Sequence, residues 1–191
     1  ILTIRDKDIT TIGDMNLAHE RAREAPFFGC ESLLRVDLKG CTKLTSLGIG
    51  AFWNCSSLTS AVLPDSLTQL GEFAFASTSL TSVVLPDSLT HVAYEAFCGC
   101  TSLTSVVLPD SLTQLGDGAF AYCSSLMSVV LPDSAELGDE VFLECDALVQ
   151  KTALAGFDTV ELYLRDRYIS ITLRKLILRL LRKYNQAVNN A

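Results

Sequence analysis

The chain has 191 residues, 49% of them hydrophobic and 19% charged, which suits one folded domain with a continuous core and excludes global disorder. No stretch reaches the ~18 consecutive apolar residues that a membrane-spanning helix requires, because arginines and lysines interrupt the most apolar segment. The formal net charge is −7, and residues 44–150 contain twelve Asp or Glu but no Lys or Arg, which excludes them as a nucleic-acid site because basic residues supply most affinity for phosphates.

The N-terminal segment is an irregular first copy of a repeat. It begins at Ile1 in what reads as the middle of a repeat, so we expect the chain to be a fragment or a processed product. Residues near 15–25 form an insertion rich in helix formers, and Asn16 is placed to cap a short helix there. His19 lies in this insertion among charged residues, so we interpret it as part of a solvated face rather than of a site.

One motif then recurs along the chain with little change. Its four clearest copies read LTSAVLPDSLTQLG, LTSVVLPDSLTHVA, LTSVVLPDSLTQLG and LMSVVLPDSAELG, and they begin at Leu58, Leu80, Leu103 and Leu126. Between the copies a phenylalanine, a cysteine and a leucine follow one another at intervals of three residues. The phenylalanines recur every 22 to 25 residues, which is a period typical of leucine-rich repeats, at Phe27, Phe52, Phe75, Phe97, Phe120 and Phe142.

Each repeat predicts one short strand, a turn and a single helical turn. Strand alternation places Val106 toward the core and Val107 outward. Pro109 ends the strand, and a bend at Gly116 leads into the helical turn that carries Phe120 into the interior. Because one coil cannot bury its apolar side chains alone, we expect the coils to stack, with their strands in a parallel sheet along one face.

The seven cysteines are an odd number, and most of them occupy one position of the repeat. We therefore interpret them as reduced core residues rather than a disulfide framework, which favours a reducing compartment. After Phe75 one residue is missing, and we expect Ser77 to take the cysteine position. Cys98 and Cys100 form a Cys-Gly-Cys pattern, but no second pair at zinc spacing accompanies it, so we expect no metal and no other cofactor.

The outward positions of the strands predict a candidate binding surface. Aligned copies place one valine per coil in an exposed column, with serines on one side, prolines on the other and aspartates at the border. The candidate binding residues are Val62, Val84, Val107, Val130, Asp65, Asp87, Asp110 and Asp133. An apolar stripe of this kind is typical of a protein-interaction site, whereas the alternative is that valine serves strand propensity and lateral packing. Since these coils are almost identical, either the ligand is repetitive or recognition lies at the variable residues elsewhere on the coil.

The C-terminal region departs from the repeat and is basic, with eight Lys or Arg against three acids in residues 151–191. Asp158 and Glu161 have the spacing of a capping box that opens a long amphipathic helix. We interpret this helix as a cap over the apolar end of the last coil. The alternative is that it binds a membrane surface or a calmodulin-like acidic partner through Arg174 to Lys183.

The pattern LxxVxLPxSLxxLGxxAFxxCxxL, from about Leu2 to Leu148, resembles the BspA-like class of leucine-rich repeats. The resemblance implies a right-handed solenoid with one parallel strand per repeat, and roles in adhesion, cell-surface recognition or other protein binding. Residues 33–47 depart from the pattern, because they lack the proline and carry Cys41, and look more like the cysteine-containing variety of the repeat.

We therefore expect an α/β fold, a leucine-rich-repeat solenoid of about six coils over residues 1–148 with short helical turns opposite the sheet, and a basic helical cap over residues 149–191. The expected function is a non-enzymatic protein-binding module with an unidentified protein partner, either inside the cell or at its surface. The alternative is a membrane- or calmodulin-linked scaffold. An enzyme would require a deep pocket that gathers Cys98 or His91 with a carboxylate, and nothing in the sequence selects such a constellation.

Overall fold

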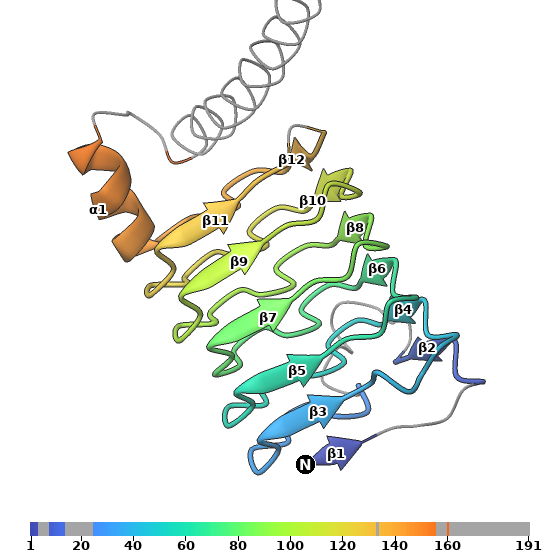
Figure 1. Ribbon diagram of the computed structural model, residues 1–191. Helices are drawn as coiled ribbons and strands as arrows, with labels where there is room; N and C mark the ends of the chain where they lie inside the picture. The colour runs from blue at the N-terminus through green and yellow to red at the C-terminus, as the bar shows by residue number, and fades with distance from the viewer. Residues whose placement is uncertain (4–7, 14–24, 133, 156–159, 161–191) are drawn as a thin grey trace, which may run out of the picture.

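The computed structural model describes residues 1–3, 8–13, 25–132, 134–155 and 160. They form six stacked coils, each of which contributes one strand to each of two parallel sheets (Figure 1). The first sheet has the order β1-β3-β5-β7-β9-β11, with bounds β1 Leu2–Thr3, β3 Arg35–Asp37, β5 Ser60–Val62, β7 Ser82–Val84, β9 Ser105–Val107 and β11 Ser128–Val130. The second has the order β2-β4-β6-β8-β10-β12, with bounds β2 Thr11–Ile12, β4 Ser46–Leu47, β6 Gln69–Leu70, β8 His91–Val92, β10 Gln114–Leu115 and β12 Glu136–Leu137.

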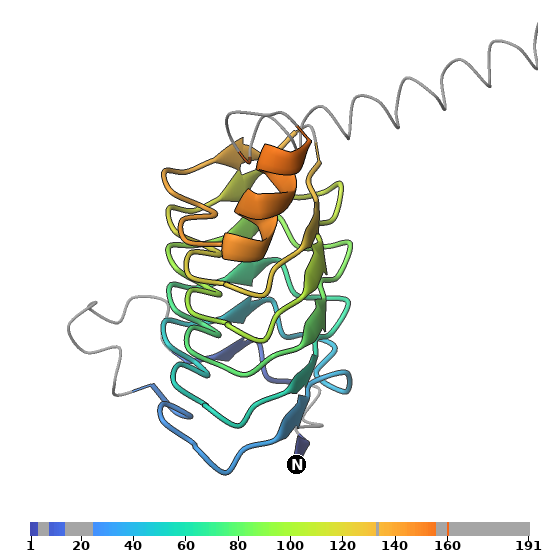
Figure 2. The ribbon, with the colours of Figure 1, turned by 90° about the vertical axis from the view of Figure 1, so that its left-hand side faces the viewer.

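The predicted solenoid with a parallel sheet along one face is confirmed, and Figure 2 shows the coils stacked one on another. The second sheet was not expected, because the sequence predicted one strand per repeat. Its strands have only two residues each, as in Gln69–Leu70, and two residues are too few to display an alternating pattern.

The expected helical turns are instead hydrogen-bonded turns, which form the third side of each coil and are called the turn edge below. The Phe97 amide donates to the Ala119 carbonyl of the next coil at 2.8 Å, rather than to a carbonyl of its own coil as a helix would require. Residues with a positive φ, in the left-handed region, flank the repeat phenylalanines from Phe52 to Phe142 on both sides and interrupt any helix. They are Gly50, Phe73, Glu95, Gly118 and Glu140 on the N-terminal side, and Asn54, Ser77, Gly99, Tyr122 and Glu144 on the C-terminal side.

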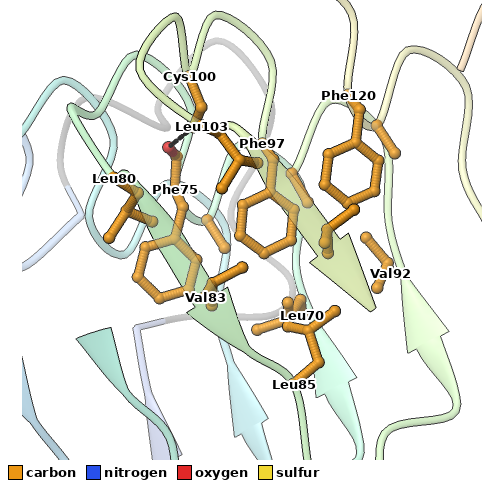
Figure 3. Packing of buried hydrophobic residues seen from close by; sticks show 14 of the residues in the cluster. Leu70, Phe75, Leu80, Val83, Leu85, Val92, Phe97, Cys100, Leu103 and Phe120 are labelled. Atoms are coloured by element: carbon orange, nitrogen blue, oxygen red, sulfur yellow. Dashed lines mark hydrogen bonds between the residues drawn. The ribbon is translucent and has the colours of Figure 1, made fainter. Parts of the chain in front are cut away.

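A single continuous core runs through all the coils, and its centre is a row of phenylalanines. Phe75, Phe97 and Phe120 stack face to face with ring centroids 5.5 and 5.1 Å apart (Figure 3). The inward strand residue Val106 is 2% exposed and its outward neighbour Val107 is 62% exposed, as the alternation predicted.

Four cysteines form a second row, in which each thiol donates a hydrogen bond to the phenylalanine carbonyl of the preceding coil; they are Cys55, Cys100, Cys123 and Cys145. Cys100 donates to Phe75 at 3.2 Å (Figure 3), and Cys123 donates to Phe97 at 3.2 Å. The sequence-based placement of Ser77 in this row is wrong. Thr78 occupies the position, and its hydroxyl contacts Cys100 Sγ at 3.2 Å while Ser77 lies on the turn edge with a φ of 55°.

Helix α1, Asp146–Leu154, lies at the C-terminal end of the array (Figure 1). It buries Leu148 and Thr152, and Lys151 Nζ donates to the Met127 carbonyl of the last coil at 3.0 Å. The predicted capping box at 158–161, the long basic helix and the insertion at 15–24 lie outside the described residues. Within the part of the chain that is described, no helix is long and apolar enough to cross a membrane.

Candidate interaction surfaces

Many polar side chains of the repeat form hydrogen bonds between stacked coils. The serine after each aspartate donates to a leucine carbonyl of the preceding coil, as from Ser88 to Leu67 and from Ser111 to Leu89, both at 2.7 Å. The threonine that follows donates similarly, and Thr113 binds the Thr90 carbonyl at 3.1 Å. These bonds satisfy carbonyl groups along the whole array. Within the described part of the chain, the outward side chains of the two sheets donate no such bonds to the preceding coil, so they are the ones available for a ligand.

The predicted valine column exists on the first sheet. Strand register pairs Val62 with Val84, Val84 with Val107, and Val107 with Val130. Val84 is 82% exposed, Val107 62% and Val130 43%, whereas Val62 is half-buried, so the apolar stripe in solvent runs from Val84 to Val130. Below, the first-sheet surface means this valine column together with the aspartate border of Asp65, Asp87 and Asp110, all exposed. The fourth predicted aspartate, Asp133, lies outside the described residues.

The sequence predicted that the prolines border the exposed valine column. In the structure they lie below the surface instead. Pro86 and Pro109 are buried, and each lines one of two hollows that valines and an aspartate also line. One hollow, of about 240 Å³, lies between Val62 and Val84, and the other, of about 300 Å³, between Val84 and Val107. The first-sheet surface therefore carries two hollows whose lining is mainly apolar and includes one aspartate each.

Charge on the first-sheet surface changes along the array. Lys39 lines the hollow nearest the N-terminal end. The hollow between Val84 and Val107 has Asp87 as its only charged lining residue among those described. The carboxylates of Asp65, Asp87 and Asp110 make no hydrogen bond or ion pair with another described residue. They remain available to a basic or hydrogen-bond-donating partner.

A larger hollow, of about 400 Å³, lies on the second sheet and was not predicted from the sequence. Its floor includes Gln69, His91 and Gln114, which are adjacent in strand register. Tyr94 and Asp117 form its wall toward the turn edge. His91 stands where other copies of the repeat carry Gln69 and Gln114, and like them it faces outward from its strand and is exposed. The variation at Tyr94 and Asp117 was visible in the sequence, but their proximity was not.

The wall of this hollow is the end of a second aromatic row, separate from the central row of phenylalanines. Phe28, Trp53, Phe73 and Tyr94 contact one another in successive coils, with centroid distances of 5.2, 5.0 and 5.4 Å. The next coil has no aromatic residue at the position of Tyr94, and Asp117 stands there between two glycines. The loss of ring volume at that step opens the hollow.

The hollow brings His91 near a carboxylate, which is part of what a catalytic site would need. However, His91 Nδ1 is bonded to the Thr90 hydroxyl at 2.7 Å rather than to Asp117. The described lining includes no Ser, Cys or Lys that could act as a nucleophile. Cys98 lies outside that lining, and burial, followed by the charge of Glu95, raises the pKa of its thiol to about 12, so the reactive thiolate is scarce at neutral pH. Among the described residues, no three metal-ligating side chains gather.

Comparisons with known proteins agree with the repeat architecture. A family profile for BspA type leucine-rich repeat regions matches residues 21–149 in six copies. The crystal structure of a T. pallidum leucine-rich repeat protein is 30% identical with a TM-score of 0.55, over 69% of this chain and 74% of that protein. No curated protein sequence matches the chain.

Two further solved structures are similar to this chain. A leucine-rich repeat protein from Bacteroides ovatus ATCC 8483 is 29% identical with a TM-score of 0.50, over 62% of this chain and 37% of that protein. A leucine-rich cell surface protein from Faecalibacterium prausnitzii A2-165 is 27% identical with a TM-score of 0.54, over 73% of this chain and 41% of that protein. The chain therefore spans less than half the length of these two proteins.

Proposed function

Because the chain belongs to the BspA-type leucine-rich repeat family, we propose that it is a non-enzymatic protein-binding module whose partner contacts the first-sheet surface. The observation that carries the proposal is the exposure of Val84 and Val107, at 82% and 62%, in a register-aligned column. Burying such side chains against a partner would remove apolar area from water, which is the main driving force of protein association.

The border residues support a particular kind of partner. Asp87 lines an apolar hollow, and Asp110 is the exposed aspartate of the next coil, in a region without Lys or Arg. A segment that alternates small apolar and basic side chains would fill the hollows and pair with the carboxylates. Electrostatic complementarity of this kind would raise the association rate, and salt would weaken it.

Cell-surface adhesion is a finer proposal within this function. It is supported by the family and by the similarity to the F. prausnitzii protein, which is described as a cell surface protein. The alternative scaffold anchored through Arg174 to Lys183 depends on residues outside the described part of the chain, and no structural observation favours it.

Binding by purified variants tests the proposal. Partners captured by the full chain would be identified by mass spectrometry, purified, and titrated against Val84→Ser/Val107→Ser and against Asp87→Lys/Asp110→Lys. Each interface anchor removed should cost at least ~1 kcal/mol, so each double variant should bind at least about tenfold more weakly. The matched control is Glu136→Lys/Asp139→Lys, which makes the same change of charge at exposed positions away from the first sheet. Unchanged binding by both first-sheet variants, with loss in the control, would contradict the proposal.

A further inference from the structure

The hollow on the second sheet has the chemistry of a small-ligand site, separate from the first-sheet surface. It combines a flat aromatic ring with several hydrogen-bonding groups in a volume of about 400 Å³. Sites for small molecules are concave and mix apolar walls with a few placed polar groups, and their volumes begin at ~300 Å³. We propose that this hollow binds a neutral carbohydrate, with Tyr94 as the stacking platform and Gln69, His91 and Gln114 as the hydrogen-bonding floor.

The floor offers both donors and acceptors to sugar hydroxyls. The amides of Gln69 and Gln114 each carry a donor group and an acceptor group. The Thr90 hydroxyl donates to the Thr68 carbonyl at 3.1 Å, in the pattern of Thr68 and Thr113, so its single proton is used there. His91 Nδ1 is then the donor in its 2.7 Å bond to Thr90, which in the neutral ring leaves Nε2 as an acceptor on a residue that lines the hollow.

The wall is fixed in place before a ligand arrives. The Tyr94 ring packs edge to face on Phe73, with the ring planes 87° apart. The Tyr94 hydroxyl donates to the Glu95 carboxylate, and this bond is the main reason that the pKa of Tyr94 is raised to about 12. A pre-ordered aromatic ring offers apolar area to the C–H face of a sugar with little loss of conformational freedom.

Charge argues for a neutral ligand rather than an ionic one. No Lys or Arg occurs in residues 44–150, so nothing in this region attracts a carboxylate or sulfate. Of the nearby acids, Asp117 accepts the Asp139 amide through Oδ1 at 2.9 Å and Glu95 accepts the Tyr94 hydroxyl, so each already has a hydrogen-bond donor within the protein. The amide and imidazole groups therefore dominate the polar lining.

Topology argues against an extended peptide in the hollow. A peptide that adds to a sheet needs an unpaired strand edge. Here β6, β8 and β10 are each paired on both sides, so only side chains face the hollow. The floor residues repeat at the strand spacing of ~4.8 Å. That spacing is close to the length of one unit in a linear glycan, so a short oligosaccharide can lie across the strands.

Titration of the full chain with defined oligosaccharides tests this proposal. The probes are linear oligomers of glucose, mannose, galactose and N-acetylglucosamine, with heparin fragments as the anionic arm and glucosamine oligomers as the cationic arm. Saturation-transfer NMR should detect binding of at least one neutral oligomer, with a Kd in about the millimolar range or tighter. Binding by charged arms alone, or by no neutral oligomer, would overturn the proposal.

Variants then locate the site. Tyr94→Ala and Gln114→Ala should each weaken sugar binding by about tenfold, because they remove the platform and a floor hydrogen bond. Tyr122→Ala is the control, since Tyr122 is an exposed tyrosine of the turn edge that does not line the hollow. Gln114 is exposed, so its variant should fold even if loss of the Phe73 contact destabilises Tyr94→Ala. Equal sugar affinity in wild type and both variants would refute the assignment of the site to this hollow. The test is independent of the one for the first-sheet surface, so either proposal can fail while the other holds.

Discussion

The first-sheet surface and the second-sheet hollow are built on the same coils but differ in regularity. On the first sheet the outward residue is valine in four successive coils, from Val62 to Val130. Around the hollow the equivalent residues change from coil to coil, as Tyr94 and Asp117 show. Stacking constrains inward side chains and hydrogen-bond donors on both sides alike, but it does not constrain the outward ones. A uniform surface therefore suits a long or repeated contact, whereas a varied one suits a single small ligand.

The largest effect should come from breaking the core that both surfaces share. Phe97→Ala removes a fully buried ring that stacks on Phe75 and Phe120, and should lower the free energy of unfolding by ~3–5 kcal/mol. Urea denaturation followed by circular dichroism would measure the loss. The exposed-valine variant Val107→Ala is the comparison, and a similar loss there would mean that the valine column is part of the core.

A second change should disturb the hollow more than the first-sheet surface. A Cβ at Gly116 would lie 2.6 Å from the Ala93 carbonyl carbon, so the backbone between two strands of the second sheet must move. We expect Gly116→Ala to cost ~1–3 kcal/mol in urea denaturation and to weaken sugar binding. The previous coil carries Ala93 at this position, so Ala93→Gly is the matched control and should change stability by less than ~1 kcal/mol. Normal stability of Gly116→Ala would show that the coils tolerate wider spacing.

Substitutions at two left-handed positions of the turn edge should change the stability of the protein in opposite directions. Gly118 has a φ of 60°, which a side chain adopts at a cost, so Gly118→Ala should lower stability by ~1 kcal/mol. Glu140 has a φ of 54° in the equivalent place, and Glu140→Gly should raise stability by ~0.5–1 kcal/mol. Thermal unfolding of the two variants would test this, and changes of the same sign would contradict it.

Titration at alkaline pH should identify Tyr94 in the wall of the hollow by its raised pKa. The Glu95 carboxylate raises the pKa of Tyr94 to about 12, above the ~10 of an unfolded tyrosine. Between these values the folded chain keeps a proton that the unfolded chain loses, so the contribution of this group to stability is present below pH ~10 and is lost as pH rises toward ~12. Ultraviolet titration of wild type and Tyr94→Phe would assign the late transition. Loss of a tyrosine that titrates near pH 10 in the variant would contradict the assignment.

The smallest effect should come from the exposed valine column. Val84→Thr keeps the β-branched shape and removes apolar surface at a residue that is 82% exposed, so stability should change by less than ~0.5 kcal/mol. Partner binding should nevertheless weaken in the same variant. A stability loss above ~1 kcal/mol in urea denaturation would show that valine is present for lateral packing in the sheet, which is the alternative that the sequence left open.

Sequence reasoning predicted the features that repeat and that depend on apolar pattern. The period, the buried row of phenylalanines and the outward direction of Val107 follow from spacing and alternation, and the structure confirms them. The second sheet could not be predicted from two-residue strands such as Gln114–Leu115. The turn edge was missed because non-glycine residues such as Phe73 and Tyr122 adopt positive φ. Their strain is offset by hydrogen bonds to the next coil, as from Tyr122 to the Leu143 carbonyl at 2.7 Å.

The hollow was missed for a different reason. Tyr94 and Asp117 are 23 positions apart in the sequence and meet only because successive coils are adjacent. They stand at the same position of successive repeats, and the sequence itself shows that this position varies. Their combination depends on how two neighbouring coils differ, which an alignment of single repeats does not display.

Among the described residues, the side-chain hydrogen bonds to backbone carbonyls of another coil all run in one direction along the array. Cys123 donates to Phe97, Ser111 to Leu89 and Thr113 to Thr90, in each case toward the N-terminal neighbour. A duplicated stretch of one full period would therefore bring its own donors and meet acceptors already facing it. A gene for this protein could therefore gain whole repeats while keeping the hydrogen bonds between adjacent coils. An insertion of half a repeat would instead place thiols and hydroxyls away from the carbonyl groups that accept their hydrogen bonds.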